Sequence, residues 1–345
     1  MRALRIGPTA LAVLTFALLQ LTSPVSVSAQ AWVPGKGWGS VSIGYKNLYV
    51  RDHLDMFGNR FDRGQIRTQV VSMDVDYGVS RRLAVNVGLP LNFLKYTGTS
   101  PHIADGIKVL DDGKYHGGAQ DFRFGLRYSL VRTGPVMITP FAEGIVPSHD
   151  YITFAHAAQG RDLRELLVGT NLGWQGGEGF LSKAFAQTRI NYSFVEKVLG
   201  RSHNRTNIDA EVGYFLTPRL ALTGIASYAK HHGGLDYDST KTPQEQWTSQ
   251  EYLKHDELMR SDQLDVGGGG SFLINRSTSV YANVLTMAWG INGHALNMGV
   301  IVGINFRFRS HKPNVSPNRL AEQESAYLGS TIPPIIRNAE LRTCH

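Results

Sequence analysis

The sequence QDFRFGLRYSL at residues 120–130 decides the fold, because large apolar and small or charged side chains alternate along it. Every second residue from Phe122 to Leu130 is aromatic or Leu, whereas the residues between them are charged, Gly or Ser. A period of two is typical of a β-strand that has one apolar and one polar face. Residues 207–214 and 298–308 repeat the pattern. The chain is therefore expected to form an antiparallel sheet with one apolar face.

Twelve strands are expected along the chain, at residues 38–50, 65–78, 83–96, 119–131, 136–146, 164–174, 181–194, 205–215, 220–230, 263–274, 279–289 and 297–308. Two irregularities are expected, a bulge at Val70-Val71 and a weakened tenth strand at the glycine run of residues 267–270.

The connections between these strands alternate in length. Short turns at residues 79–82, 133–135, 217–218 and 275–277 alternate with long gaps at residues 51–64, 97–117, 147–162 and 233–261. Bacterial outer-membrane barrels have an even number of strands, short periplasmic turns and long extracellular loops. The predicted fold is all-β, with a single antiparallel transmembrane β-barrel of about 12 strands over residues 37–308.

The two ends of the chain lie outside the predicted barrel. Residues 1–29 are typical of a signal peptide, with Arg2 and Arg5 before an apolar run and with cleavage expected after Ala29 or Ala31. The apolar run is shorter than the ~20 residues that a membrane-spanning helix needs. Residues 309–345 are expected to form a periplasmic tail, disordered or with a short helix near 317–328. An even strand count then places both termini in the periplasm of a Gram-negative envelope.

Composition narrows the partners of the protein. The 345 residues carry a formal charge of +7, and the single cysteine is Cys344, so the chain forms no internal disulfide. A mild basic excess suits contact with outer-membrane lipid and lipopolysaccharide, and it is too small for a nucleic-acid binder. A small-molecule solute is the other expected partner, and the oligomeric state is left open.

Three parts of the sequence resemble a known family. Residues 37–45, the hairpin of residues 77–96 with Val87-Gly88-Leu89-Pro90, and the closing strand through Phe308 look like outer-membrane barrels described as transporters of the phenol-degradation MetA-pathway type. The resemblance implies a porin-like outer-membrane channel or uptake protein for small molecules, with hydrophobic or aromatic compounds as candidates. The chain departs from the usual outer-membrane ending, because a tail follows Phe308.

The polar face of the predicted strands places charges of both signs inside the barrel. The expected pore-lining residues are Arg67, Asp74, Asp76, Arg123, Arg127, Glu143, Arg189, Asp209, Glu211, Asp265 and Arg307. Such groups bind passing solutes in a wet pore. In a structural barrel of this size, the same groups pair with one another and fill the interior. The sequence leaves both alternatives open.

Histidines are concentrated in the predicted extracellular gaps. Ten of the 12 lie in or beside these gaps: His53, His102, His116, His149, His156, His203, His231, His232, His255 and His294. Imidazole is a common transition-metal ligand, and the densest candidate for metal capture is His231-His232 with Asp236 and Asp238. Because no pair of these histidines has a recognised ligand spacing, the sequence assigns no metal and no cofactor.

Catalysis is the weaker functional class. Ser202-His203-Asn204 and Ser148-His149-Asp150 contain the residue types of a hydrolase, but neighbouring residues in a strand point to opposite faces. No catalytic residue is assigned, and the protein is predicted not to be an enzyme. The favoured hypothesis is a small-molecule channel. The alternatives are an outer-membrane hydrolase acting on lipid or peptide, and a structural or adhesive barrel with a closed lumen.

The gap at residues 233–261 is long enough to contain structure of its own. Thr242-Pro243 favours a helix that begins there and continues through Trp247, Tyr252 and Leu258. Such a helix would form a lid or an adhesive loop over the barrel.

Overall fold

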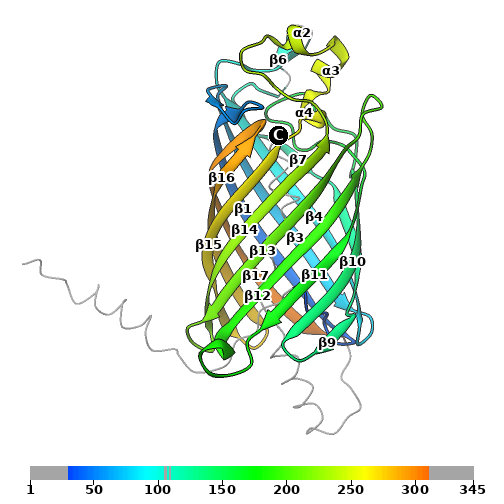
Figure 1. Ribbon diagram of the computed structural model, residues 1–345, viewed down its shortest axis with the longest axis vertical. Helices are drawn as coiled ribbons and strands as arrows, with labels where there is room; N and C mark the ends of the chain where they lie inside the picture. Colours follow the sequence, from blue (N-terminus) through cyan, green and yellow to red (C-terminus); the bar gives the residue numbers. More distant parts are fainter. Residues whose placement is uncertain (1–29, 105–106, 109, 311–345) are drawn as a thin grey trace, which may run out of the picture.

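The computed structural model describes residues 30–104, 107–108 and 110–310 (Figure 1). The predicted signal peptide of residues 1–29 and the possible helix near 317–328 lie outside the described residues. These two predictions therefore remain predictions.

The described chain forms one closed antiparallel barrel, which confirms the predicted fold class (Figure 1). Each long strand pairs with the next along the chain, β10 pairs with β11, and β17 closes the circle by pairing with β1. The twelve long strands are β1 (Trp38–Leu54), β3 (Gln65–Gly78), β4 (Leu83–Thr97), β8 (Phe122–Tyr128), β10 (Val136–Val146), β11 (Glu165–Gln175), β12 (Ala184–Val195), β13 (His203–Phe215), β14 (Leu220–Gly233), β15 (Asp262–Asn275), β16 (Thr278–Ile291) and β17 (Gly293–Arg309).

Five short strands complete the sheets. β2 (Arg60–Phe61) pairs with β1, and β9 (Val131–Thr133) pairs with β10. β5 (Ile103–Ala104) and β6 (Ile107–Lys108) form a separate hairpin in the loop between β4 and β8. β7 (His116–Ala119) pairs with β4 beyond the end of β8.

The predicted strand at residues 119–131 is interrupted between β7 and β8. Pro90 of β4 lies opposite the interruption, and its carbonyl accepts a hydrogen bond from the Gln120 N–H at 2.9 Å. In an antiparallel pair the N–H and C=O of one residue point to the same neighbour, and proline has no N–H. The ladder therefore lacks one donor at this point, which explains the break in the strand.

The expected bulge at Val70-Val71 is wrong. β3 pairs with β1 and with β4 in unbroken register, so Val70 is fully buried while Val71 is 39% exposed. The irregularity lies instead on β1, where the register against β17 shifts between Tyr49 and Asp52. The glycines at residues 267–270 pair regularly, and the register shifts of β15 lie on either side of them. A Cβ at Gly269 would lie 2.0 Å from the Ala282 carbonyl oxygen, so glycine permits this close approach.

The two ends of the barrel differ as the loop lengths predict. The long connections at residues 55–64, 98–121, 147–164 and 234–261 gather at one end, drawn at the top of Figure 1. Two connections at the same end are shorter, namely residues 196–202 and Asn292 alone between β16 and β17. The length alternation is therefore a tendency rather than a strict rule in this chain.

The lid, defined here as residues 234–261, covers this end of the barrel. A helix begins after Thr242 as predicted, but the lid contains three short helices: α2 (Pro243–Gln246), α3 (Ser249–Leu253) and α4 (His255–Leu258). Trp247 is extended and ends α2, and Thr248 then caps α3. Trp247 is buried in a small core with Leu163, Val198 and Leu258. Burial of this side chain explains why the predicted single helix is broken at Trp247.

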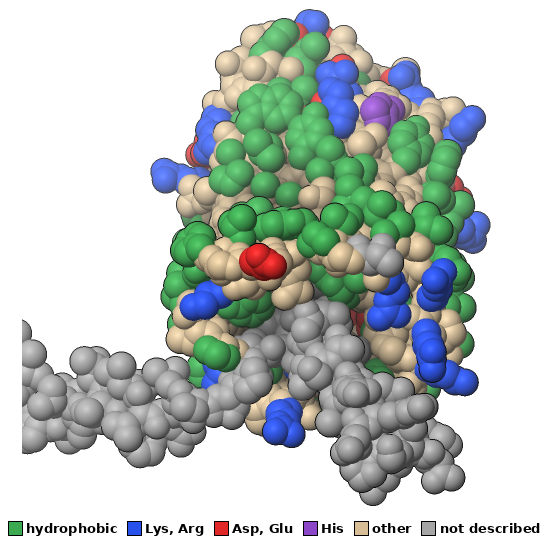
Figure 2. Space-filling model, turned by 60° about the horizontal axis from the view of Figure 1, so that its bottom comes forward, with side chains coloured by type: hydrophobic (Ala, Val, Ile, Leu, Met, Phe, Trp, Pro, Cys, Tyr) green, Lys and Arg blue, Asp and Glu red, His purple; other side chains and the backbone are tan. Residues whose placement is uncertain are grey.

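The outer wall of the barrel is apolar. Ile43, Met73, Val87, Phe124 and Val284 are between 42% and 53% exposed and come from five different strands. Figure 2 shows hydrophobic side chains spread over the wall, with Lys and Arg side chains mainly toward the ends. Such a surface suits a hydrocarbon environment, because apolar side chains in contact with lipid tails are removed from water and need no hydrogen-bond partners.

Within the described residues, no helix has the length and apolar character needed to span a bilayer.

The packing of the lid gives a first prediction. Trp247→Ala leaves a cavity in the lid core, which costs about 3–5 kcal/mol for a buried Trp. We expect proteases to cleave the lid faster in this variant, while the barrel keeps its resistance to SDS without heating. Leu253→Ala is the matched control, because Leu253 lies on α3 and is 48% exposed. Equal cleavage rates in the two variants would contradict the packing role of Trp247.

Candidate functional site

The barrel interior holds ten of the eleven residues that the sequence placed there. Asp74, Asp76, Arg123, Arg127, Glu143, Arg189, Asp209, Glu211, Asp265 and Arg307 lie on the inner face, and all except Asp74 and Asp76 are buried. Their positions alternate with outward apolar residues along the same strands, as in β8. Whether they line a conducting pore is addressed under Proposed function.

The placement of Arg67 on the inner face is wrong. Arg67 shares the outer face of β3 with Val71 and Met73, and its side chain is exposed. The guanidinium lies 4.3 Å from the centroid of the Tyr49 ring and donates to Asn47 Oδ1 at 3.3 Å. Without a bulge at residues 70–71, Arg67 and Asp74 are an odd number of residues apart and face opposite sides of the sheet.

Ion pairs connect the inner-face charges across intervening strands. Arg127 on β8 pairs with Asp76 on β3, and Arg123 lies 3.5 Å from Asp74 on the same two strands. Arg189 on β12 lies 3.5 Å from Glu143 on β10. In each case one strand of the wall separates the two partners. Buried charges are stable only when paired in this way, because desolvation of an isolated charge costs several kcal/mol.

The N-terminal segment, residues 30–33, lies inside the barrel. Gln30 is buried, and its side-chain oxygen accepts a hydrogen bond from Arg189 at 2.8 Å, while its carbonyl accepts one from Arg127. The Thr139 hydroxyl donates to the Ala31 carbonyl at 2.6 Å.

Apolar contacts hold the same segment in place. Ala31 and Trp32 pack with Phe185 and Ala221. A Cβ at Gly173 would come within 2.9 Å of the Trp32 ring, so a glycine at this position leaves room for the indole. The N-terminal segment therefore occupies the barrel interior near the end opposite the lid.

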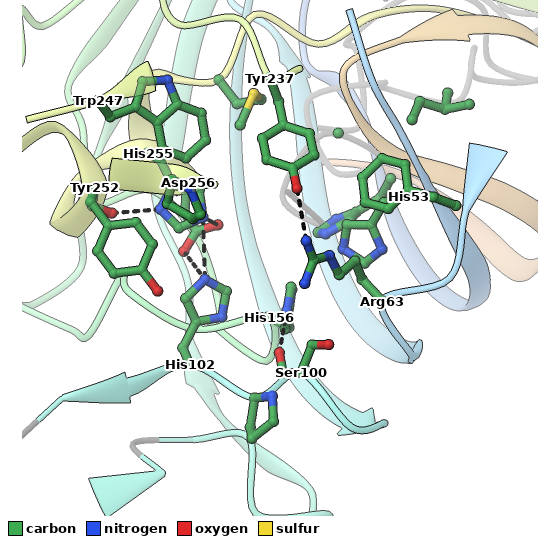
Figure 3. Close-up of a pocket in the computed structure, with 17 residues that line it drawn as sticks. His53, Arg63, Ser100, His102, His156, Tyr237, Trp247, Tyr252, His255 and Asp256 are labelled. Carbon is green, nitrogen blue, oxygen red and sulfur yellow. Dashed lines mark hydrogen bonds and ion pairs between the residues drawn. The ribbon is translucent and has the colours of Figure 1, made fainter. Parts of the chain in front are cut away.

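A cavity of about 130 Å³ lies at the mouth of the barrel, between the lid and the loops beneath it (Figure 3). Four aromatic side chains line it, from Phe61, Tyr237, Trp247 and Tyr252. Five imidazoles lie among them, from His53, His102, His156, His255 and His294, and the His255 ring stacks on both Trp247 and Tyr252. Arg63 donates to the Tyr237 hydroxyl at 2.9 Å. The mouth therefore combines a flat apolar surface with a dense group of nitrogen ligands.

Burial sets the protonation of the mouth groups. It lowers the pKa of the His255 imidazole to about 4 and raises the pKa of the Asp256 carboxyl to about 7. The His156 imidazole also has a pKa well below its usual value, because it is buried beside other histidines. These imidazoles are therefore neutral at pH 7, which is the form that binds metal ions.

The metal candidate chosen from sequence does not form a cluster. The His231 N–H donates to Asp262 at 2.7 Å, whereas His232 points to the other face of β14 and lies 2.8 Å from the Thr206 hydroxyl. Asp236 lies 2.9 Å from Arg260, and Asp238 lies 3.2 Å from Lys241. Consecutive strand residues point in opposite directions, so two adjacent histidines in a strand do not converge on one ion.

The hydrolase candidates show incomplete catalytic geometry. Residues 147–150 lie in a bend rather than a strand, so the Ser148 hydroxyl reaches His149 Nδ1 at 2.9 Å. The other ring nitrogen faces the Gln159 amide at 3.4 Å rather than a carboxylate. Among the residues the structure describes, neither ring nitrogen of His203 has a hydrogen-bond partner. His149 therefore has an amide and not a carboxylate at its second nitrogen, and His203 has no orienting group among the described residues.

The sequence missed the histidine group at the mouth. His102, His156 and His255 come from three different loops, between residues 98 and 258, so no sequence spacing indicates that they meet. The one signal in the sequence is the enrichment of histidine in the long gaps. It indicates the end of the barrel at which the histidines meet but not which of them meet.

Comparisons with known proteins give structural matches only. No protein-family model matches the sequence, and no curated protein matches it. An outer-membrane channel from Pseudomonas putida F1 has a TM-score of 0.61 at 10% identity, over 81% of this chain and 98% of that chain.

Two further solved structures match less well. The translocator domain of the autotransporter NalP from Neisseria meningitidis has a TM-score of 0.45 at 12% identity, over 87% of this chain and 96% of that chain. The NanC porin has a TM-score of 0.44 at 9% identity, over 78% and 98%. At such low identity, the match to the Pseudomonas channel shows that the two proteins share an outer-membrane barrel fold.

The inner ion pairs give a second prediction. Arg127→Met removes the partner of Asp76 and the donor to Gln30, and breaking a buried pair costs about 3–5 kcal/mol. We expect the variant to unfold at a clearly lower urea concentration than the wild-type protein.

Arg67→Met is the control for this measurement, because Arg67 lies on the outer face and its contact with Tyr49 is worth about 1 kcal/mol or less. If the two substitutions lower the unfolding midpoint equally, the assignment of inner and outer faces on these strands is wrong.

Proposed function

We propose that this protein is an outer-membrane channel for the uptake of small molecules. The main observation behind the proposal is that a separate peptide, the N-terminal segment, obstructs the barrel. The N-terminal segment fills part of the lumen as a peptide that is separate from the wall, and it is held there by a few hydrogen bonds and by Trp32. A segment of this kind can leave without disrupting the strand ladder. The likeness of the barrel to the Pseudomonas channel supports the same reading.

The proposed orientation places the lid outside the cell and both termini in the periplasm. Long loops on the extracellular side and short turns on the periplasmic side are the rule for such barrels. Gln30 then enters the barrel from the periplasmic end. Cleavage of the predicted signal peptide after Ala29 leaves Gln30 in the mature chain, where it keeps its contacts with Arg127 and Arg189.

The inner-face charges would form the polar path in this proposal. Glu143 and Arg189 face each other at 3.5 Å, and Asp209 accepts a hydrogen bond from Ser227 at 2.8 Å. Charges of both signs occur around the wall, so the path would favour neither cations nor anions strongly.

The mouth cavity suggests small aromatic compounds as the solute. Its volume of about 130 Å³ is similar to that of engineered apolar cavities that hold benzene, at ~150 Å³. Tyr237, Trp247 and Tyr252 offer ring faces and edges to a flat ligand. The proposal is that the solute first binds in this cavity and then passes to the lumen below.

A closed structural barrel is the competing function, and one observation favours it. Six of the ten inner-face charges pair with one another, so these six need no solute or ion to compensate them. Ion conductance distinguishes the two functions, because a structural barrel carries no current with or without the N-terminal segment.

Loosening the N-terminal segment gives a third prediction. Trp32→Gly removes the indole that packs with Phe185 and Ala221, and Val33→Gly removes a second buried apolar side chain of the segment. In planar bilayers we expect the single-channel conductance to rise at least twofold over that of the wild-type protein. Lys36→Gly is the control, since Lys36 is exposed just beyond the segment. A double variant that inserts into the bilayer but has the conductance of the wild-type protein would contradict the channel proposal.

The aromatic cavity gives a fourth prediction. Phenol added on the lid side should reduce the current, and Tyr252→Leu should raise the half-blocking concentration roughly fivefold, because one aromatic contact is worth about 1 kcal/mol. Tyr115→Leu is the control, as Tyr115 is 47% exposed and lies outside the cavity. Equal block of both variants would show that phenol acts elsewhere.

A further inference from the structure

Two loops meet at the mouth through the imidazoles of His102 and His255. His102 belongs to the loop between β4 and β8, and His255 is the first residue of α4 in the lid. Their Nε2 atoms lie 3.2 Å apart. The Asp256 carboxylate lies beside both, with Oδ2 3.6 Å from His102 Nε2 and Oδ1 3.4 Å from His255 Nε2 (Figure 3). One ligand atom from each of these three residues therefore lies within 4.8 Å of the other two.

The hydrogen bonds on the far side of each ring determine which nitrogen carries a proton. His255 Nδ1 lies 2.6 Å from the Tyr252 carbonyl oxygen, which only accepts, so Nδ1–H is the donor. His102 Nδ1 lies 3.1 Å from Asp111 Oδ2 and donates to that carboxylate. In the neutral rings, both Nε2 atoms then carry lone pairs. Two lone pairs facing each other at 3.2 Å repel unless a cation lies between them.

The separations match tetrahedral metal coordination. Zinc binds imidazole nitrogen and carboxylate oxygen at about 2.0–2.2 Å, which places neighbouring ligand atoms roughly 3.3 Å apart. In the mouth the two Nε2 atoms lie 3.2 Å apart, while Asp256 approaches His255 Nε2 with Oδ1 at 3.4 Å and His102 Nε2 with Oδ2 at 3.6 Å. A cation at the centre would reach all three ligands with only small side-chain movements.

The surroundings of the three ligands favour a bound cation. Asp256 is buried, and its Oδ2 has no hydrogen-bond partner among the described residues. The lone pairs of this unpartnered oxygen are therefore available to a bound cation.

Asp111 acts as a positioning residue for His102. Its carboxylate accepts backbone hydrogen bonds from His102, His156 and Ala157 at 2.8, 3.2 and 2.9 Å, so it is fixed before it contacts the ring. Metal-binding histidines commonly donate their second nitrogen to a carboxylate or a backbone carbonyl. Both arrangements occur here, on His102 and on His255 respectively.

We propose that His102, His255 and Asp256 bind one divalent transition-metal ion, for which Zn²⁺ is the best fit. Two imidazoles and a carboxylate suit Zn²⁺ and not the harder Mg²⁺, which prefers oxygen ligands and retains its water. Because the ligands come from two loops that are 153 residues apart in sequence, the ion ties the lid to the loop beneath it. The fourth coordination position is left for water.

A Zn²⁺ titration of the full-length protein in detergent, after treatment with a chelator, tests the proposal by calorimetry. We expect one ion per chain in the wild-type protein, at least tenfold weaker binding in His255→Ala and in Asp256→Asn, and no binding of Mg²⁺. His116→Ala is the matched control, because His116 forms an exposed pair with Asp112 at 2.7 Å and should leave the affinity unchanged. Resistance of each variant to SDS without heating shows that the barrel is folded.

A second measurement tests the tie between the loops. Zn²⁺ should slow proteolysis of the lid in the wild-type protein and in His116→Ala, but not in His255→Ala. Absence of saturable Zn²⁺ binding in the wild-type protein would overturn the proposal, as would unchanged affinity in His255→Ala.

The neighbouring histidines provide a third comparison. The ring nitrogens of His53, His156 and His294 also lie within 4.8 Å of one another. If His294→Ala abolishes binding while His255→Ala retains it, the ion belongs to that group and the assignment is wrong. Binding and protection are measured without solute flux, so they give an answer even if the barrel conducts nothing.

Discussion

Closure of the strand ladder is the constraint on which the rest of the structure depends. A sheet in hydrocarbon has no water to satisfy its edges, so β17 must pair with β1, and it does so over residues 293–309 and 38–54. Closure also separates the side chains into two sets, because successive residues point outward and inward. The apolar wall, the charged lumen and the position of the N-terminal segment all follow from this separation. The loops are not constrained by this alternation of inward and outward side chains, and the irregular structure of the chain lies in them.

The strands could be predicted from the sequence because their period is local, and the exceptions have local physical causes. Alternation located twelve strands and the inward side of ten charged residues. It failed at Arg67 because Val70 and Val71 are both apolar, so the sequence there does not show which of them faces the lumen. The alternation also does not indicate the interruption between β7 and β8. This interruption is caused by Pro90 on the neighbouring strand β4, which has no backbone N–H to donate.

The mouth could not be predicted in the same way, because its partners are distant in sequence. His102 and His255 meet only after the lid has folded over the loop between β4 and β8. That folding depends on the small core around Trp247, whose burial also breaks the helix that the sequence predicted. The packing of this core therefore links the shape of the lid to the position of α4, because Trp247 and Leu258 both belong to it. The positions of the histidines depend on packing between distant segments, so they cannot be predicted from helical or strand periodicity.

In the proposed channel, the ion pairs of the lumen determine how much free energy is needed to remove the N-terminal segment. Arg127 contacts both the Gln30 carbonyl of the N-terminal segment and the Asp76 carboxylate of the wall. Arg189 likewise contacts the Gln30 side chain and lies near Glu143. When the segment leaves, each guanidinium keeps a carboxylate partner two strands away in the wall, so neither buried guanidinium is left alone. The cost of opening is then limited to the hydrogen bonds of Gln30 and Ala31, two of which come from guanidinium groups, and to the burial of Trp32; it does not include an unpaired buried charge. The ion pairs that fill the lumen are thus compatible with a movable segment, because they stabilise the wall whether or not the segment is in place.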